Sequence, residues 1–267
     1  ANFELEYKVT PTIMLVISPN INQSHSNNNL ISASKSKNDK EEAINENATK
    51  SNKEIDNLSL GNTINFNKTF SKKLRNLSFV YSNSYSSVDS EGLTLSKTIF
   101  FQNNRPTIDR NQNILNNNKS NSNSADIEFI EPITDSLRVR IGVDLDWVNE
   151  ISELKTYDFD ASSQSYNDLN DLQSNYTNSS RNSVRPKLGL TYEKNKYTFN
   201  FNSSTSIIDY DNHSLYLNKD TDLNQKHMLP YINAQIRYRF TRSKYFTLKY
   251  DYDNTLPTPV QLIPVAN

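Results

Sequence analysis

Apolar and charged residues alternate strictly between positions 137 and 147. Leu, Val, Ile and Trp occupy the odd positions, whereas the even positions hold Arg138, Arg140, Gly142, Asp144 and Asp146. Successive residues of a β-strand face opposite sides of a sheet, so the pattern predicts a strand with one apolar and one charged face. Four charges cannot enter a dry core without a large desolvation cost. The charged face must therefore be wet.

The same period of two recurs along the chain and predicts an all-β protein with about ten strands and no helix. No stretch approaches the roughly 20 apolar residues that a membrane helix requires. Any membrane-spanning structure must therefore be a β-barrel, and we expect the chain to form an antiparallel up-and-down transmembrane β-barrel segment, a partial barrel. The predicted strands cover residues 3–9, 12–24, 58–70, 76–85, 137–147, 188–194, 197–210, 231–240 and 245–252, with a weaker strand at 128–131.

Short and long connections alternate between these strands. Tight turns are expected near 10–11, 71–75, 133–136, 194–196 and 241–244, and long polar loops at about 25–55, 102–125, 160–183 and 212–226. Such loops far exceed the 2–5 residues of ordinary hairpin connections. Outer-membrane barrels have minimal periplasmic turns and longer extracellular loops. We therefore expect one rim of each kind, with the segments 35–56 and 111–124 as irregular loops, because their polar composition offers little to bury.

Aromatic residues near the expected strand ends fit two interpretations. They suit the interfacial girdles that flank the apolar band of a membrane barrel, and they equally suit cross-strand packing. The residues concerned are Phe70, Phe100, Phe101, Tyr157, Phe159, Phe240, Tyr245 and Phe246.

The composition excludes several kinds of protein. Hydrophobic residues make up 34% of the 267 residues and the mean hydropathy is -0.76, too little for a thick conventional core. The net charge of -1, from 29 basic and 30 acidic residues, gives no basic excess for nucleic acid or for an anionic membrane surface.

The chain starts without a secretory signal pattern. We expect it to be part of a longer protein.

No candidate catalytic, cofactor-binding or metal-binding site emerges. The chain has no cysteine, and His25, His213 and His227 lie far apart in polar surroundings without metal-ligand spacing. Four glycines form no phosphate-binding loop. Four aspartates bracket one expected loop but lack a calcium-loop spacing, so we interpret them as solvated: Asp158, Asp160, Asp168 and Asp171. We expect no enzymatic activity and no cofactor.

Four stretches resemble the barrel region of TonB-dependent-receptor-like outer-membrane β-barrel proteins. They are 66–86, 154–169, 185–201 and 229–265, and the last is the most specific because a strand, a basic turn, a Tyr-rich strand and Pro-x-Pro-x-Gln-Leu-x-Pro follow in order. The likeness spans nearly the whole chain. The 25–55 segment and the scarcity of glycine depart from the family pattern.

The resemblance implies a protein of the Gram-negative cell outer membrane that takes up a bulky solute, with an N-terminal plug inside a barrel of about 22 strands. Its implied partners are outer-membrane lipid, an inner-membrane energising complex, a surface lipoprotein and an unknown solute, but no nucleic acid. The plug and the remaining C-terminal strands are not expected within 1–267, which we interpret as part of one barrel domain.

Two alternatives remain open at this stage. One is a non-transporting adhesion or assembly platform in the outer membrane. The other is a soluble secreted carbohydrate-binding β-sandwich, for which alternation is equally expected. In the barrel, Val139, Ile141 and Val143 face lipid and the charged residues of 138–146 face the lumen. An arginine at Val143 would then cost roughly 2–4 kcal/mol near the bilayer midplane.

Overall fold

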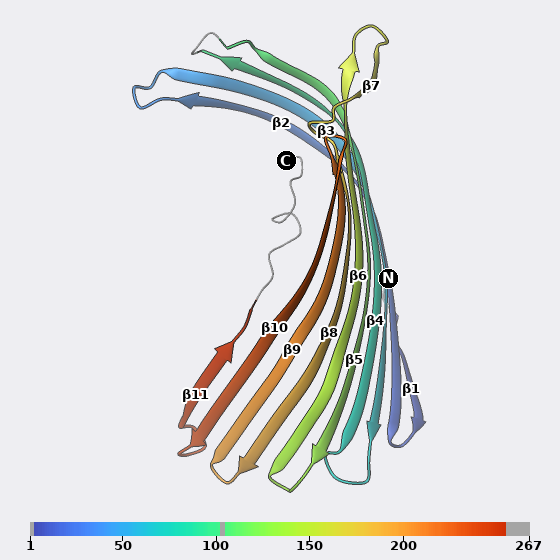
Figure 1. Ribbon diagram of the computed structural model, residues 1–267, viewed down its shortest axis with the longest axis vertical. Coiled ribbons are helices and arrows are strands. Elements are labelled where there is room, and N and C mark those ends of the chain that lie inside the picture. The colour runs from blue at the N-terminus through green and yellow to red at the C-terminus, as the bar shows by residue number, and fades with distance from the viewer. Residues whose placement is uncertain (1–2, 102–104, 255–267) are drawn as a thin grey trace.

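The computed structural model describes residues 3–101 and 105–254, and these form a single antiparallel sheet of eleven strands (Figure 1). Each strand pairs with the next along the chain, which is the up-and-down arrangement predicted from the sequence. The strands are β1 (Leu5–Thr10), β2 (Ile13–Lys37), β3 (Ala43–Thr69), β4 (Asn76–Phe100), β5 (Ile108–Pro132), β6 (Leu137–Asp160), β7 (Ser165–Leu169), β8 (Asn175–Lys194), β9 (Tyr197–Tyr216), β10 (Lys219–Arg239) and β11 (Tyr245–Tyr252).

The short strand β7 is the one departure from simple succession. It pairs with the end of β6 at residues 157–160, whereas β8 pairs with the earlier part of β6 at residues 137–154. The two strands thus follow one after the other along the same edge of β6. The described residues contain one sheet and no second sheet stacked on it, so the β-sandwich alternative is wrong and the partial β-barrel is confirmed.

The expected long loops are the main error of the sequence analysis. Strands β2 and β3 run through most of 25–55 and leave only 38–42 between them. Strand β5 begins at Ile108 and therefore occupies most of 102–125, including all of 111–124. Likewise β7 and β8 cover most of 160–183, and β9 and β10 leave two residues of 212–226 between them. The weak strand at 128–131 is the last part of β5.

These polar segments form strands because hairpin hydrogen bonding does not require an apolar face. Ser51 and Thr94 share a hydroxyl hydrogen bond of 3.0 Å across β3 and β4, and Ser152 donates its hydroxyl to Asn118 at 2.6 Å across β6 and β5. Such cross-strand pairs stabilise a sheet when both of its faces are wet. Alternation of apolar and polar residues identifies a strand only where one face of the sheet is shielded from water.

The sheet curves strongly, as Figure 1 shows, and burial distinguishes its two faces. Asp144, Thr156 and Asn212 are among the least exposed residues, and the strand register places all three on one face. On the other face Ile141 is 59% exposed, together with Ile207 and Leu248. Side chains converge on the inside of a curved sheet and spread apart on the outside. The first face is therefore concave and the second convex.

The convex face carries a continuous apolar band next to the short turns. On β6 it covers the odd positions from 137 to 147, and the same row continues through Phe79 on β4, Leu188 on β8 and Phe199 on β9. Farther along the strands the convex face becomes charged. Asp56 on β3 lies opposite Asp89 on β4, and its Oδ1 is hydrogen-bonded to Nδ1 of His25 at 2.8 Å.

The strands are 20–27 residues long from β2 to β10, apart from β7, about twice the 9–11 residues of a transmembrane β-strand. About half of each strand therefore extends past the apolar band. Of the aromatic residues near strand ends, Phe100, Tyr157 and Phe159 lie in that extension, so they do not flank the band. Phe159 packs against Tyr166 with ring centroids 5.2 Å apart, as the cross-strand alternative predicts. No helix in the described ranges is long and apolar enough to cross a membrane.

Candidate functional site on the concave face

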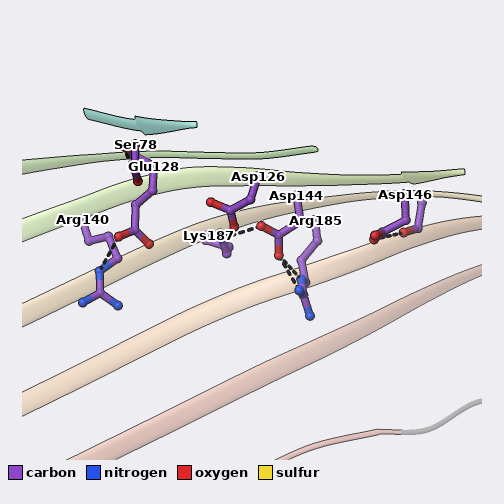
Figure 2. A network of polar contacts seen from close by, with 9 residues as sticks. Ser78, Asp126, Glu128, Arg140, Asp144, Asp146, Arg185 and Lys187 are labelled. Carbon is purple, nitrogen blue, oxygen red and sulfur yellow. Dashed lines mark hydrogen bonds and ion pairs between the residues drawn. The ribbon is translucent and has the colours of Figure 1, made fainter. Parts of the chain in front are cut away.

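Charged side chains from three adjacent strands meet on the concave face, at the level of the apolar band. The register sets Asp126 of β5 opposite Asp144 of β6, and Asp144 opposite Arg185 of β8. Figure 2 shows these side chains on the same side of the sheet, together with Lys187. The sequence predicts one wet face for the charged residues of 138–146, and the strand register confirms that they share the concave face: Arg138, Arg140, Asp144 and Asp146.

Lys187 joins two carboxylates at the centre of this network. Its ammonium group contacts both Asp126 and Asp144, and Arg185 donates from Nε to Oδ2 of Asp144 at 2.7 Å. The side chain of Asp144 is only 10% exposed and that of Lys187 is 22% exposed. Buried charges are tolerated when each meets an opposite charge, and here each carboxylate does.

Weaker contacts continue the network along the strands. Nε of Arg140 lies 3.4 Å from Oε1 of Glu128, and Ser183 donates its hydroxyl to Asp146 at 3.0 Å. A hollow of about 560 Å³ opens over Glu128 and Arg140, with Arg185 and polar side chains of β9 in its wall. Its walls carry charges of both signs, so the hollow suits water or a polar solute.

Gly142 makes room for the lysine bridge. It lies opposite Lys187 in the register, and a Cβ at this position would come 2.7 Å from the carbonyl oxygen of Ile127 and 3.2 Å from Cε of Lys187. The backbone contact leaves little freedom to adjust. Glycine here allows the lysine stem to cross the strand and reach both carboxylates.

We expect Gly142→Ala to destabilise the folded protein by about 1–3 kcal/mol, as overpacking of a closed site does. The measurement is the urea concentration at half-unfolding in lipid vesicles. Gly61→Ala is the matched control, because the atoms nearest to its added Cβ belong to the side-chain amide of Asn20, which can rotate away. Equal effects of the two changes would show that the lysine crossing has no special need for glycine.

The partners of the charged row on β6 lie outside the strands predicted from the sequence. Arg185 and Lys187 alternate with Pro186 and Leu188 just as the β6 charges alternate with apolar residues, but the strand was expected to begin only at 188. Asp126 fell at the boundary of the expected loop at 102–125. Extending the period of two backward from 188 would have found both basic residues.

Three of the four aspartates near 158–171, namely Asp158, Asp160 and Asp171, accept hydrogen bonds from polar neighbours at the rim with the long hairpins, and Asp168 is exposed. Asp158 accepts hydrogen bonds from Gln112 at 2.7 Å and Asn170 at 2.8 Å. The Ser162 hydroxyl donates to Asp160 at 2.7 Å and lowers the pKa of Asp160 to about 2. No group of three or more metal-ligating side chains occurs among residues 3–101 and 105–254.

A second hollow, of about 840 Å³, lies at the same rim. Its walls combine residues from the ends of the β2–β3 and β4–β5 hairpins with Phe159 and Asn170. Phe159 precedes β7 in the sequence and Asn170 follows it directly. Gln112 is nearly buried beside it and donates to both Asp158 and Gln173. These hydrogen bonds tie the connection between β7 and β8 to β5, and the hollow has a mixed apolar and polar surface.

Together the topology and the two unlike faces define the class: a curved, open, up-and-down sheet that forms part of a β-barrel. No protein-family model matches the chain, and no curated protein matches it. Among solved structures it is similar to the ferric yersiniabactin uptake receptor FyuA from Yersinia pestis, with a TM-score of 0.44 and 6% sequence identity. The match covers 93% of this chain and 43% of that receptor, so the chain spans less than half the receptor's length. A likeness this distant carries no functional argument, and the fold assignment rests on the strand pairing.

Proposed function

We propose that this chain forms part of the wall of a TonB-dependent-receptor-like β-barrel in the Gram-negative outer membrane, and that the whole protein takes up a bulky solute. One observation carries the proposal. The convex face exposes a band of Ile, Leu, Val and aromatic side chains at the level where the concave face carries ion pairs. An exposed apolar surface of this extent favours contact with lipid.

The concave face supports a wet lumen in this proposal. Ion pairs such as Lys187–Asp144 would line the path of a polar solute, and the hollow of about 840 Å³ at the rim of the long hairpins would meet the solute first. We assign the chain a structural and solute-contacting role with no catalytic step. An energising complex in the inner membrane and a surface lipoprotein are the partners that such a receptor would use.

Single cysteines test whether the protein lies in the outer membrane and which of its rims faces outward. The chain has no cysteine of its own, so each introduced thiol is labelled alone. Ser163→Cys lies in the turn between β6 and β7, and Ser71→Cys lies in the short turn between β3 and β4; both positions are exposed. In intact cells a membrane-impermeant maleimide should label the first variant and not the second. Permeabilising the outer membrane should expose the second. Labelling of both in intact cells, or recovery of the protein in the soluble fraction, would contradict the proposal.

Uptake needs a separate measurement, because an adhesion platform would have the same topology. Cells with and without the intact protein are incubated in a complex medium, and mass spectrometry then follows which bulky solutes leave the medium. Depletion that requires the protein and stops when an uncoupler is added supports energised uptake. Identical media from both strains would favour the adhesion platform.

A further inference from the structure

The overall charge of -1 hides a strong separation of charge between the two rims. The five short turns, at residues 11–12, 70–75, 133–136, 195–196 and 240–244, hold a single acidic residue, Asp135. They hold six basic residues: Lys72, Lys73, Arg75, Lys196, Arg242 and Lys244. The antiparallel register brings all five turns to the same rim, which is the lower edge in Figure 1. The net charge of -1 alone argued against binding to an anionic membrane surface, but the topology gathers the basic residues at one rim, so that argument does not hold.

The opposite rim has the reverse balance. The described residues of its connections, 38–42, 101, 105–107, 161–164, 170–174 and 217–218, include two basic and four acidic residues. The basic excess is therefore a property of one rim and does not reflect polar loops in general.

Part of the basic rim is turned toward the convex, apolar side. Glu131 is on the convex face, because it pairs with Val139, and it accepts hydrogen bonds of 2.7 Å from both Lys72 and Arg75. Lys68 lies over the ring of Phe70 at 5.1 Å. These contacts hold the cations beside the edge of the apolar band.

Aromatic rings form a row at the same level. Phe70 packs edge-on against Phe129 at 6.2 Å, and Tyr238 packs against Tyr197 and Phe240, each at 4.8 Å. Both Tyr197 and Phe240 are more than half exposed. Amphipathic rings and long basic side chains at the edge of an apolar band are typical of the headgroup region of a bilayer.

We propose that this basic and aromatic collar, residues 68–75, 194–197 and 238–246, binds anionic glycerophospholipid headgroups in the leaflet next to the short turns. The inference rests on the proposed membrane location and adds a lipid preference to it. A basic residue near an anionic surface contributes about 1 kcal/mol, which is about a fivefold change in binding. Phospholipid is favoured over an acidic protein because the cations lie beside lipid-facing rings.

The test uses the intact protein in mixed vesicles of phosphatidylcholine and phosphatidylglycerol. Native mass spectrometry of the extracted protein gives the ratio of the two retained lipids. Wild type should retain phosphatidylglycerol in excess of its share. The variant Lys73→Gln/Lys196→Gln/Arg242→Gln removes three exposed cations that make no ion pair within the described residues, and it should reduce the excess at least fivefold. Added inorganic phosphate should not replace the lipid.

The matched control changes three exposed lysines near the other rim, Lys40→Gln/Lys50→Gln/Lys219→Gln. It should keep the wild-type lipid ratio. An unchanged lipid ratio in the first variant, or an equal loss of the phosphatidylglycerol excess in both variants, would overturn the inference. The basic rim would then be better explained as a binding surface for a protein partner. Failure of the wild type to enter either lipid would instead contradict the membrane location, so the two failures are distinguishable.

Discussion

Replacement of Ile141 by arginine should destabilise folding into a lipid bilayer by roughly 2–4 kcal/mol. Ile141 lies on the convex face of β6, near the middle of the apolar band, and is 59% exposed. In a water-soluble protein, a change at such an exposed position alters stability by about 0.5 kcal/mol or less. The size of the effect therefore reports whether this face contacts hydrocarbon or water.

Asn149→Arg is the matched control for this prediction. Asn149 lies on the same strand and the same face, beyond the end of the apolar band, and is also exposed. At that height a charge should cost about 0–1 kcal/mol. Both values come from urea titrations of the intact protein in lipid vesicles, followed by tryptophan fluorescence. Two small and equal effects would show that the convex face is not in lipid.

The sequence predicted the strands best where the two faces meet different surroundings. The alternation from 137 to 147 exists because one face is apolar and the other carries charge, and that contrast is visible in a single strand. The segments at 25–55 and 111–124 carry polar residues on both faces, so they lack the apolar alternation that marks a strand. Their polar composition is equally suited to an irregular loop, and only pairing with a neighbouring strand distinguishes the two.

The charged network was predictable in part for the same reason. Asp144 was placed on the wet face by its own strand, whereas its contact with Lys187 depends on the register between β6 and β8. That register brings together residues 43 positions apart in the chain, and periodicity within one strand carries no information about it. Which charges neutralise one another is thus decided by topology, although which face they occupy is decided locally.

Replacement of Lys187 by methionine should destabilise the folded protein by roughly 2–4 kcal/mol. Removing one partner of a buried ion pair costs about 3–5 kcal/mol because the other charge is left unpaired, and the value is lower here because water reaches Asp126, which is 38% exposed. Without the ammonium group, the carboxylates of Asp126 and Asp144 face each other across β5 and β6. Methionine keeps most of the volume of the lysine stem, so the loss reports charge and not packing.

Two further variants separate this network effect from the loss of any lysine. Lys155→Met removes an ammonium group that pairs with Glu153 at 2.6 Å in a more exposed setting, and it should cost about 1 kcal/mol or less. Adding Asp126→Asn to Lys187→Met should restore part of the stability, because only one carboxylate then remains without a lysine. If Lys187→Met lowers the free energy of unfolding no more than Lys155→Met does in the same urea titration, water solvates each charge of the concave face separately. In that case the ion pairs line the lumen without holding the three strands together.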